Sequence, residues 1–194
     1  MFNKPRLLTP GPTPLPERVR LALAQDMIHH RKPGFKKILL ETETMLQKLF
    51  GTEQPVLPLS CSGTGAMTAA VHGLFLPGET VIVVNGGKFG ERWSKIAAVR
   101  GLKVVEIDVA WGQAVTPAQV EQALREHPEA KGVLMQVCET STAAQHPVEA
   151  IARLTRTREV LLVADGISAV GISPCPMDAW GIDCLLTGSQ KGLM

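Results

Sequence analysis

Apolar residues recur in two different rhythms along the chain. Between Phe35 and Leu49 they repeat at intervals of three and four positions, the spacing of one buried helical stripe, and Gly51 is placed to end that helix. A shorter helical pattern precedes it at residues 19–23. From residue 55 onward, apolar runs such as VIVV and VLLVA alternate with helix-like stretches. The chain therefore predicts helices first and then alternating strands and helices.

The alternating part predicts an α/β domain. The expected strands are Val56–Ser60, Thr80–Val84, Lys103–Ile107, Gly132–Cys138, Val160–Ala164 and Cys184–Thr187, and the expected helices are Ala66–Phe75, Glu91–Arg100, Pro117–Glu126 and Val148–Thr157. Nearly continuous apolar strands are typical of a sheet that helices cover on both faces. We therefore expect a three-layer α/β fold with a mostly parallel sheet, and ligand-binding residues at the carboxyl ends of its strands.

The composition of the chain and the sequences at its two ends exclude several classes of protein. Proline-rich residues 1–16 predict an extended arm, and residues 17–194 one domain. No segment resembles a signal peptide or a membrane span, the net charge is only +2, and the four cysteines form no C-x-x-C pair. We expect a soluble cytoplasmic protein without a nucleic-acid, membrane or metal partner. Because the chain ends three residues after Lys191, we also expect an incomplete domain that lacks a C-terminal small domain.

Small, polar and aromatic residues follow the first predicted strands. Ser62, Gly63 and Thr64 open a helix, whose N–H groups and dipole suit a phosphate, although the same residues also suit a plain helix cap. Phe89 stands among glycines and could stack on a flat ligand or fill the core. Thr140 belongs to a cluster of hydroxyls that could bind a ligand or cap the next segment.

Ionisable residues follow the last predicted strands. Asp165 comes after VLLVA and could pair with a cationic ring nitrogen or accept backbone N–H bonds, a common fate of loop acids. Lys191 lies in a glycine-flanked loop and could act as an amine nucleophile, although most lysines are solvated. An anion loop, an aromatic ring, a carboxylate and a lysine together meet the needs of pyridoxal 5′-phosphate (PLP).

The motifs that carry these residues resemble those of a known enzyme family. LLTPGPTPLP, HHRKPGF, SGTGAM, NGGKFGERW, CETST, ADGISAVG and GSQKGLM are similar to segments of the class V aminotransferases of fold-type I, nearest to the alanine–glyoxylate and serine–pyruvate group. The resemblance covers essentially the whole chain. It implies a homodimeric, PLP-dependent transaminase that moves an amino group from a small amino acid (alanine or serine) to a 2-oxo acid (glyoxylate or pyruvate).

The same resemblance implies how the cofactor would be held. The Ser62–Thr64 loop and Gln190 would bind the phosphate. Phe89, where relatives often carry Trp, would stack on the pyridine ring, and Ile167 would pack against its other face. Thr140 would hydrogen-bond on the side of the 3′ oxygen.

It also implies catalytic and substrate-binding roles. Lys191 would form a Schiff base with the cofactor and move the substrate proton, while Asp165 would keep the pyridine nitrogen protonated. The backbone near Gly11 would border the substrate. The arginine that binds the substrate carboxylate is expected beyond residue 194, so Arg31 and Arg92 are interpreted as surface or intersubunit salt-bridge residues.

Other functions compete with this interpretation. Phosphonate and phosphoserine aminotransferases differ only in substrate, whereas cysteine desulfurases usually carry His where Gln190 stands. A catalytically incomplete fragment would only bind cofactor or a partner chain. A dehydrogenase is disfavoured, because the dinucleotide-binding fingerprint requires other residues in place of Thr68 and Asn85.

Overall fold

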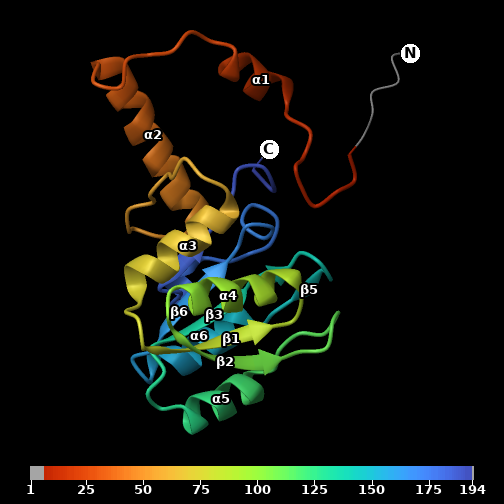
Figure 1. Ribbon diagram of the computed structural model, residues 1–194. Coiled ribbons are helices and arrows are strands. Elements are labelled where there is room, and N and C mark those ends of the chain that lie inside the picture. The colour runs from red at the N-terminus through yellow and green to blue at the C-terminus, as the bar shows by residue number, and fades with distance from the viewer. Residues whose placement is uncertain (1–6, 194) are drawn as a thin grey trace.

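A computed structural model describes residues 7–193, so that the first six residues of the predicted arm lie outside the described part. Its centre is a five-stranded sheet in which every pair of neighbours is parallel (Figure 1). The strand order across the sheet is β2 (Lys103–Asp108), β1 (Thr80–Asn85), β3 (Gly132–Gln136), β6 (Leu161–Asp165) and β7 (Cys184–Leu186). A short antiparallel pair follows β3, formed by β4 (Cys138–Glu139) and β5 (Ala144–Gln145).

Helices cover both faces of the sheet. On one face, α3 (Gly63–Leu74) and α4 (Lys88–Val99) bury side chains against alternate strand residues such as Leu134 and Val163. On the other face, α5 (Pro117–Glu126) and α6 (Val148–Arg156) pack on the intervening residues of the same strands. The predicted three-layer α/β fold with a parallel sheet is thereby confirmed.

One predicted strand is wrong. Residues 56–60 form no strand, and apart from the half-buried Val56 they are exposed. Pro58 has no N–H to donate to a ladder, so this apolar stretch cannot serve as an interior strand. The predicted strand at residues 132–138 also ends earlier, because the chain leaves β3 after Gln136 and pairs locally as β4.

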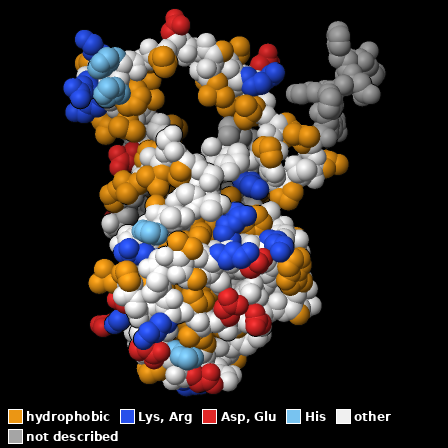
Figure 2. Space-filling view, in the orientation of Figure 1, with side chains coloured by type: hydrophobic (Ala, Val, Ile, Leu, Met, Phe, Trp, Pro, Cys, Tyr) orange, Lys and Arg blue, Asp and Glu red, His pale blue; other side chains and the backbone are white. Residues whose placement is uncertain are grey.

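The helices before the sheet are present, but one of them is not buried as expected. The chain forms α1 (Glu17–Leu23) and α2 (Pro33–Phe50), and Gly51 ends α2 in the left-handed conformation with φ 62°. Of the residues in α2 only Phe50 is buried, and Met45 is 61% exposed. Figure 2 shows apolar side chains over the region that α1 and α2 form. The apolar stripe of α2 therefore lies largely uncovered within the described residues.

One further helix completes the described elements. A four-residue helix, α7 (Met177–Trp180), precedes β7. Within residues 7–193, none of the helices combines the length and apolar character that crossing a lipid bilayer requires. Over the same residues, His, Cys, Asp and Glu side chains do not gather in threes around a point that could hold a metal ion.

Candidate functional site

Asp165 is the last residue of β6 and lies at the carboxyl edge of the sheet. Because Leu161 and Val163 face the α3–α4 layer and side chains alternate along a strand, Asp165 faces that layer too. The side chain is only 5% exposed, and its Oδ1 accepts a hydrogen bond from the Ile167 N–H at 2.8 Å. Its register partner Gln136 is fully buried, with a side-chain amide that no described residue hydrogen-bonds.

The Asp165 carboxylate lacks solvation and has cations nearby. Burial raises its pKa from 3.8 to about 6. The hydrogen bond from the Ile167 N–H opposes this increase in pKa, the negative charge of Glu139 adds to it, and the positive charges of Arg92 and Lys191 oppose it. A further cation beside Asp165 would relieve the cost of burying its charge.

The Ser62–Thr64 loop forms the start of α3. The Ser62 hydroxyl caps this helix by accepting a hydrogen bond from the Gly65 N–H at 3.3 Å, so the helix-cap interpretation of this serine describes the observed geometry. The first N–H groups of a helix have no intrahelical acceptors and remain suited to an anion. A Cβ on Gly63 would lie 2.4 Å from Ile167 Cδ1, which shows how closely the segment after β6 covers this loop.

Phe89 lies in the first turn of α4, one turn earlier than the predicted helix start and not in a loop. It is half-buried, so it does not fill the core. The Arg92 guanidinium lies 4.7 Å from the centre of the Phe89 ring, and Arg92 Nη1 donates a hydrogen bond to Thr64 Oγ1 at 2.9 Å. Arg92 is therefore half-buried and held by two residues of its own chain, which corrects the expectation of a surface position.

Thr140 connects the loop after β4 with the loop after β6. Its Oγ1 lies 2.6 Å from the Ser168 hydroxyl, which in turn donates to the Cys138 carbonyl at 3.3 Å. Thr140 therefore does not cap the following segment. Among the other hydroxyls of this cluster, that of Thr142 accepts a hydrogen bond from the Ala144 N–H at 3.4 Å, and that of Ser141 accepts one from the Lys88 N–H of α4 at 3.1 Å.

Glu139 is a site residue that the sequence analysis did not identify. It is fully buried, and its carboxylate accepts hydrogen bonds from the N–H groups of Phe89 (3.1 Å), Gly90 (3.0 Å) and Ser141 (3.0 Å). The N-cap residue of α4, Gly87, has no side chain to cap the helix, so Glu139 does so from across the sheet edge. An acid directly after an apolar strand is the signal that could have identified it.

Lys191 lies in the loop after β7, against residues of the N-terminal arm. The N–H of Thr13 donates to the Gln190 carbonyl at 3.3 Å, and the Thr13 hydroxyl donates to the Lys191 carbonyl at 3.1 Å. A Cβ on Gly11 would lie 2.3 Å from Lys191 Cδ. The Gln190 side chain turns back toward Gly188, where a Cβ would meet its Oε1 at 2.8 Å. The arm thus contacts the lysine loop of its own chain.

Substituting Gly11 with alanine is expected to displace the Lys191 side chain. The added methyl would lie 2.3 Å from Lys191 Cδ and 2.9 Å from the Gln190 carbonyl oxygen, so the flexible lysine side chain must move away and the backbone beside it must shift. We expect the rate at which an aldehyde label reacts with Lys191 to fall about tenfold, as measured by peptide mapping after borohydride reduction. Gly34→Ala is the matched control, because a Cβ there meets nothing within 4 Å. Equal labelling in the two variants would show that Gly11 does not confine Lys191.

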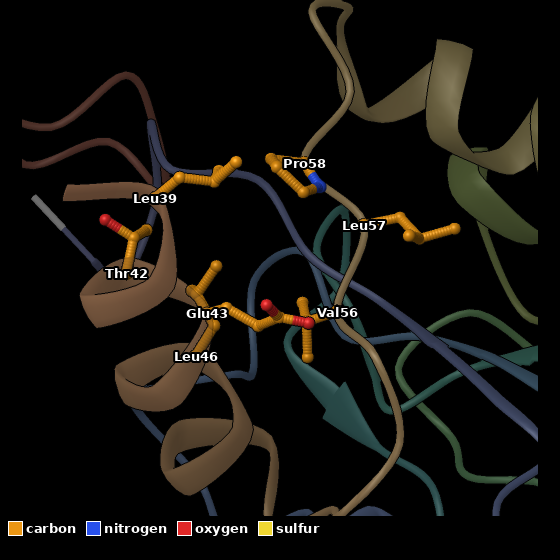
Figure 3. Close-up of a pocket in the computed structure, with 7 residues that line it drawn as sticks. All are labelled: Leu39, Thr42, Glu43, Leu46, Val56, Leu57 and Pro58. Atoms are coloured by element: carbon orange, nitrogen blue, oxygen red, sulfur yellow. The ribbon is translucent and has the colours of Figure 1, made fainter. Parts of the chain in front are cut away.

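A separate apolar hollow of about 180 Å³ lies between α2 and residues 56–58. Figure 3 shows α2 and the loop facing each other across it, with Leu39 directed toward Pro58 and Glu43 toward Val56. The hollow is lined by Leu39, Thr42, Glu43, Leu46, Val56, Leu57 and Pro58. None of the predicted site residues lines this hollow. It belongs with the uncovered apolar stripe of α2 and not with the chemistry at the sheet edge.

Comparisons with known proteins agree on one family. The family model for Aminotransferase class-V matches residues 10–194. The small subunit of a soluble hydrogenase from Synechococcus sp. is 36% identical over 100% of this chain and 51% of its own length. The serine–glyoxylate aminotransferase of Methylorubrum extorquens is 33% identical over 97% of this chain and 48% of its own length.

A solved structure gives the same result. The crystal structure of an alanine–glyoxylate aminotransferase from Nostoc sp. matches with a TM-score of 0.93 and 32% identity, over 99% of this chain and 52% of that one. The chain thus spans about half the length of the curated relatives and structures that it matches.

Proposed function

Because the chain belongs to the class V aminotransferases, whose family model matches residues 10–194, we propose that it provides the cofactor-binding part of a PLP-dependent transaminase. The amino donor would be a small amino acid such as alanine or serine, and the acceptor a 2-oxo acid such as glyoxylate or pyruvate. The names of the Methylorubrum extorquens and Nostoc proteins support this substrate class. The observation that carries the proposal is that these groups lie near one another: a Cβ on Gly63 would lie 2.4 Å from Ile167, two residues after Asp165, and the charge of Lys191 acts on Asp165.

The residues at this edge fit the chemical groups of PLP. Asp165 is a buried carboxylate with a raised pKa, which a protonated ring nitrogen would stabilise in its charged form. The start of α3 suits a phosphate, and the half-buried Phe89 offers an aromatic surface. Lys191 supplies the amine that the cofactor requires.

Each residue would then have a defined task. The Ser62–Thr64 loop and Gln190 would hold the phosphate, Phe89 and Ile167 would bracket the ring, and Thr140 would bind its 3′ oxygen side. When bound, the cofactor withdraws electrons from the α-carbon of the amino acid.

Lys191 and Asp165 would act directly in catalysis. Lys191 would attach the cofactor covalently through Nζ, and this amine, when released, would take the proton from the α-carbon and hold it for return. Asp165 would retain its negative charge and pair with the ring nitrogen. Gly11 would border the substrate through its backbone, close to Nζ.

The proposed assembly is a homodimer, in which the N-terminal arm (residues 1–16) and the domain (residues 17–194) belong to one subunit. The apolar stripe of α2 supports this, since Ile38 is 48% exposed and Met45 61% exposed. Contiguous exposed apolar surface is typical of surfaces that become covered in an assembly.

The decisive experiment is to add PLP to the purified chain, reduce the adduct with borohydride and map the labelled peptide. We expect a visible absorption band and label on Lys191, in preference to exposed lysines such as Lys88 and Lys95. Loaded protein would then be screened with alanine, serine and aspartate against glyoxylate and pyruvate. Label spread evenly over the exposed lysines of a folded sample would contradict the proposal.

A further inference from the structure

Arg92 joins two parts of the site that lie on different helices. From α4 it reaches Thr64 in the first turn of α3, with Nη1 donating to Oγ1 at 2.9 Å. On its own helix it contacts Phe89, three residues earlier, with its guanidinium carbon 4.7 Å from the ring centre. Phe89 and Arg92 share a helix face because they are three residues apart, so the Arg92 side chain can contact Phe89 and Thr64 at the same time. Arg92 is half-buried.

These two partners stand where two parts of one ligand would lie. Phe89 is the proposed ring contact, and Thr64 belongs to the proposed phosphate loop. Ring and phosphate are covalently joined in the cofactor, so the protein must hold their binding sites at a matching separation. A planar guanidinium suits this task, because it can stack on an aromatic ring while its N–H groups hydrogen-bond in the plane.

Resting on the function proposed above, we propose that Arg92 is a positioning residue that fixes the Phe89 ring relative to the Thr64 hydroxyl and so sets the affinity for the phosphorylated cofactor. Arg92 acts through these two residues and is not itself a ligand of the cofactor. Its positive charge also acts on Asp165, in the direction that favours the carboxylate. The chain thus has a structural connection between its anion loop and its aromatic contact.

The test measures PLP affinity in a double-mutant cycle. The variants are Arg92→Met, the pair Thr64→Val with Phe89→Leu, and the combination of all three substitutions. Arg92→Met is expected to weaken PLP binding about tenfold, the effect of losing one hydrogen bond from a charged group. In the Thr64→Val, Phe89→Leu background the same substitution is expected to change the affinity less than twofold. The visible circular dichroism of bound PLP should change with Arg92→Met, because the ring is no longer held in one orientation.

Lys95→Met provides the matched control, because it removes a positive charge from the exposed side of the same helix. It is expected to leave both PLP affinity and the dichroism unchanged. An equal loss of affinity from Arg92→Met in both backgrounds would overturn the proposal, since Arg92 would then contact the cofactor directly. Unchanged affinity in Arg92→Met would overturn it as well.

A second cycle without cofactor separates this proposal from the proposed function. The urea midpoints of Arg92→Met, Phe89→Leu and the double variant report on the contact in the protein alone. We expect non-additive shifts, because each single substitution breaks the same contact. Additive shifts would overturn the positioning role even if PLP labels Lys191. Failure of wild-type protein to bind PLP, with non-additive shifts retained, would reject the proposed function and the role in cofactor affinity, but it would leave the positioning of Phe89 by Arg92 established.

Discussion

Replacing Lys191 with alanine is expected to abolish the visible band that PLP forms with the protein and to remove the borohydride-stable label. Amino transfer should fall by at least about 10²–10⁴-fold, the range that general acid–base catalysis alone contributes. The physical reason is that Lys191 is the proposed source of both the covalent amine and the group that moves the α-proton. Absorbance spectra, peptide mapping and single-turnover exchange with alanine measure these three losses.

Two control variants separate the amine from its charge. Lys191→Arg keeps a positive charge near Asp165 but carries a guanidinium in place of the primary amine that bonds to an aldehyde, so it should fail like Lys191→Ala. Lys95→Ala removes an exposed lysine of α4 and should behave like the wild type. Substantial exchange by Lys191→Arg would show that the lysine contributes only charge.

Asp165→Asn is expected to lower activity while raising the stability of the cofactor-free protein above pH 6. Without the carboxylate the ring nitrogen loses its partner, and amino transfer should fall roughly 100-fold or more, as when one preorganised electrostatic contact is lost. The stability effect has the opposite sign, because burial of Asp165 raises its pKa from 3.8 to about 6. A neutral amide avoids the cost of burying that charge.

The raised pKa also fixes the pH range of this effect. The folded chain binds the Asp165 proton more tightly than the unfolded chain, so this contribution to stability is fully present below pH 3.8 and is lost as pH rises through about 6. The full loss is on the order of 3 kcal/mol. The difference in unfolding free energy between Asp165→Asn and wild type should therefore grow in favour of the variant between pH 4 and 7.

Asp108→Asn is the control, since Asp108 also ends a strand but is exposed. Urea unfolding of cofactor-free protein at several pH values gives the comparison. A constant difference between Asp165→Asn and wild type over this range would mean that the carboxyl titrates normally. Adding PLP should reverse the ranking at pH 7, because the wild-type carboxylate then has a cationic partner.

Most of the fold could be predicted from the sequence alone, because its elements are encoded in short stretches of neighbouring residues. The apolar strands of the sheet and the Thr116 start of α5, which forms a full capping box, are encoded in short stretches. Local pattern failed at residues 56–60, where an apolar run resembles a strand but Pro58 cannot pair. The periodicity of α2 also predicted a buried stripe, which is largely exposed. Periodicity shows that one face of a helix is apolar, but it does not show what covers that face.

Sequence by itself determined that chemically distinctive residues follow successive strands, and parallel topology brings strand ends to one edge. This is why the positions of Asp165 and Lys191 could be predicted. The Ser62–Thr64 loop follows no strand, because residues 56–60 are irregular, and only the tertiary structure places it against Ile167 in the segment after β6. Only the tertiary structure decided how they are supported: Glu139 caps α4 from β4, Arg92 links two helices, and the arm contacts Lys191. Each of these contacts joins segments that are far apart in the chain. The directions in which the side chains point depend on how these segments pack, and a local sequence pattern does not contain that information.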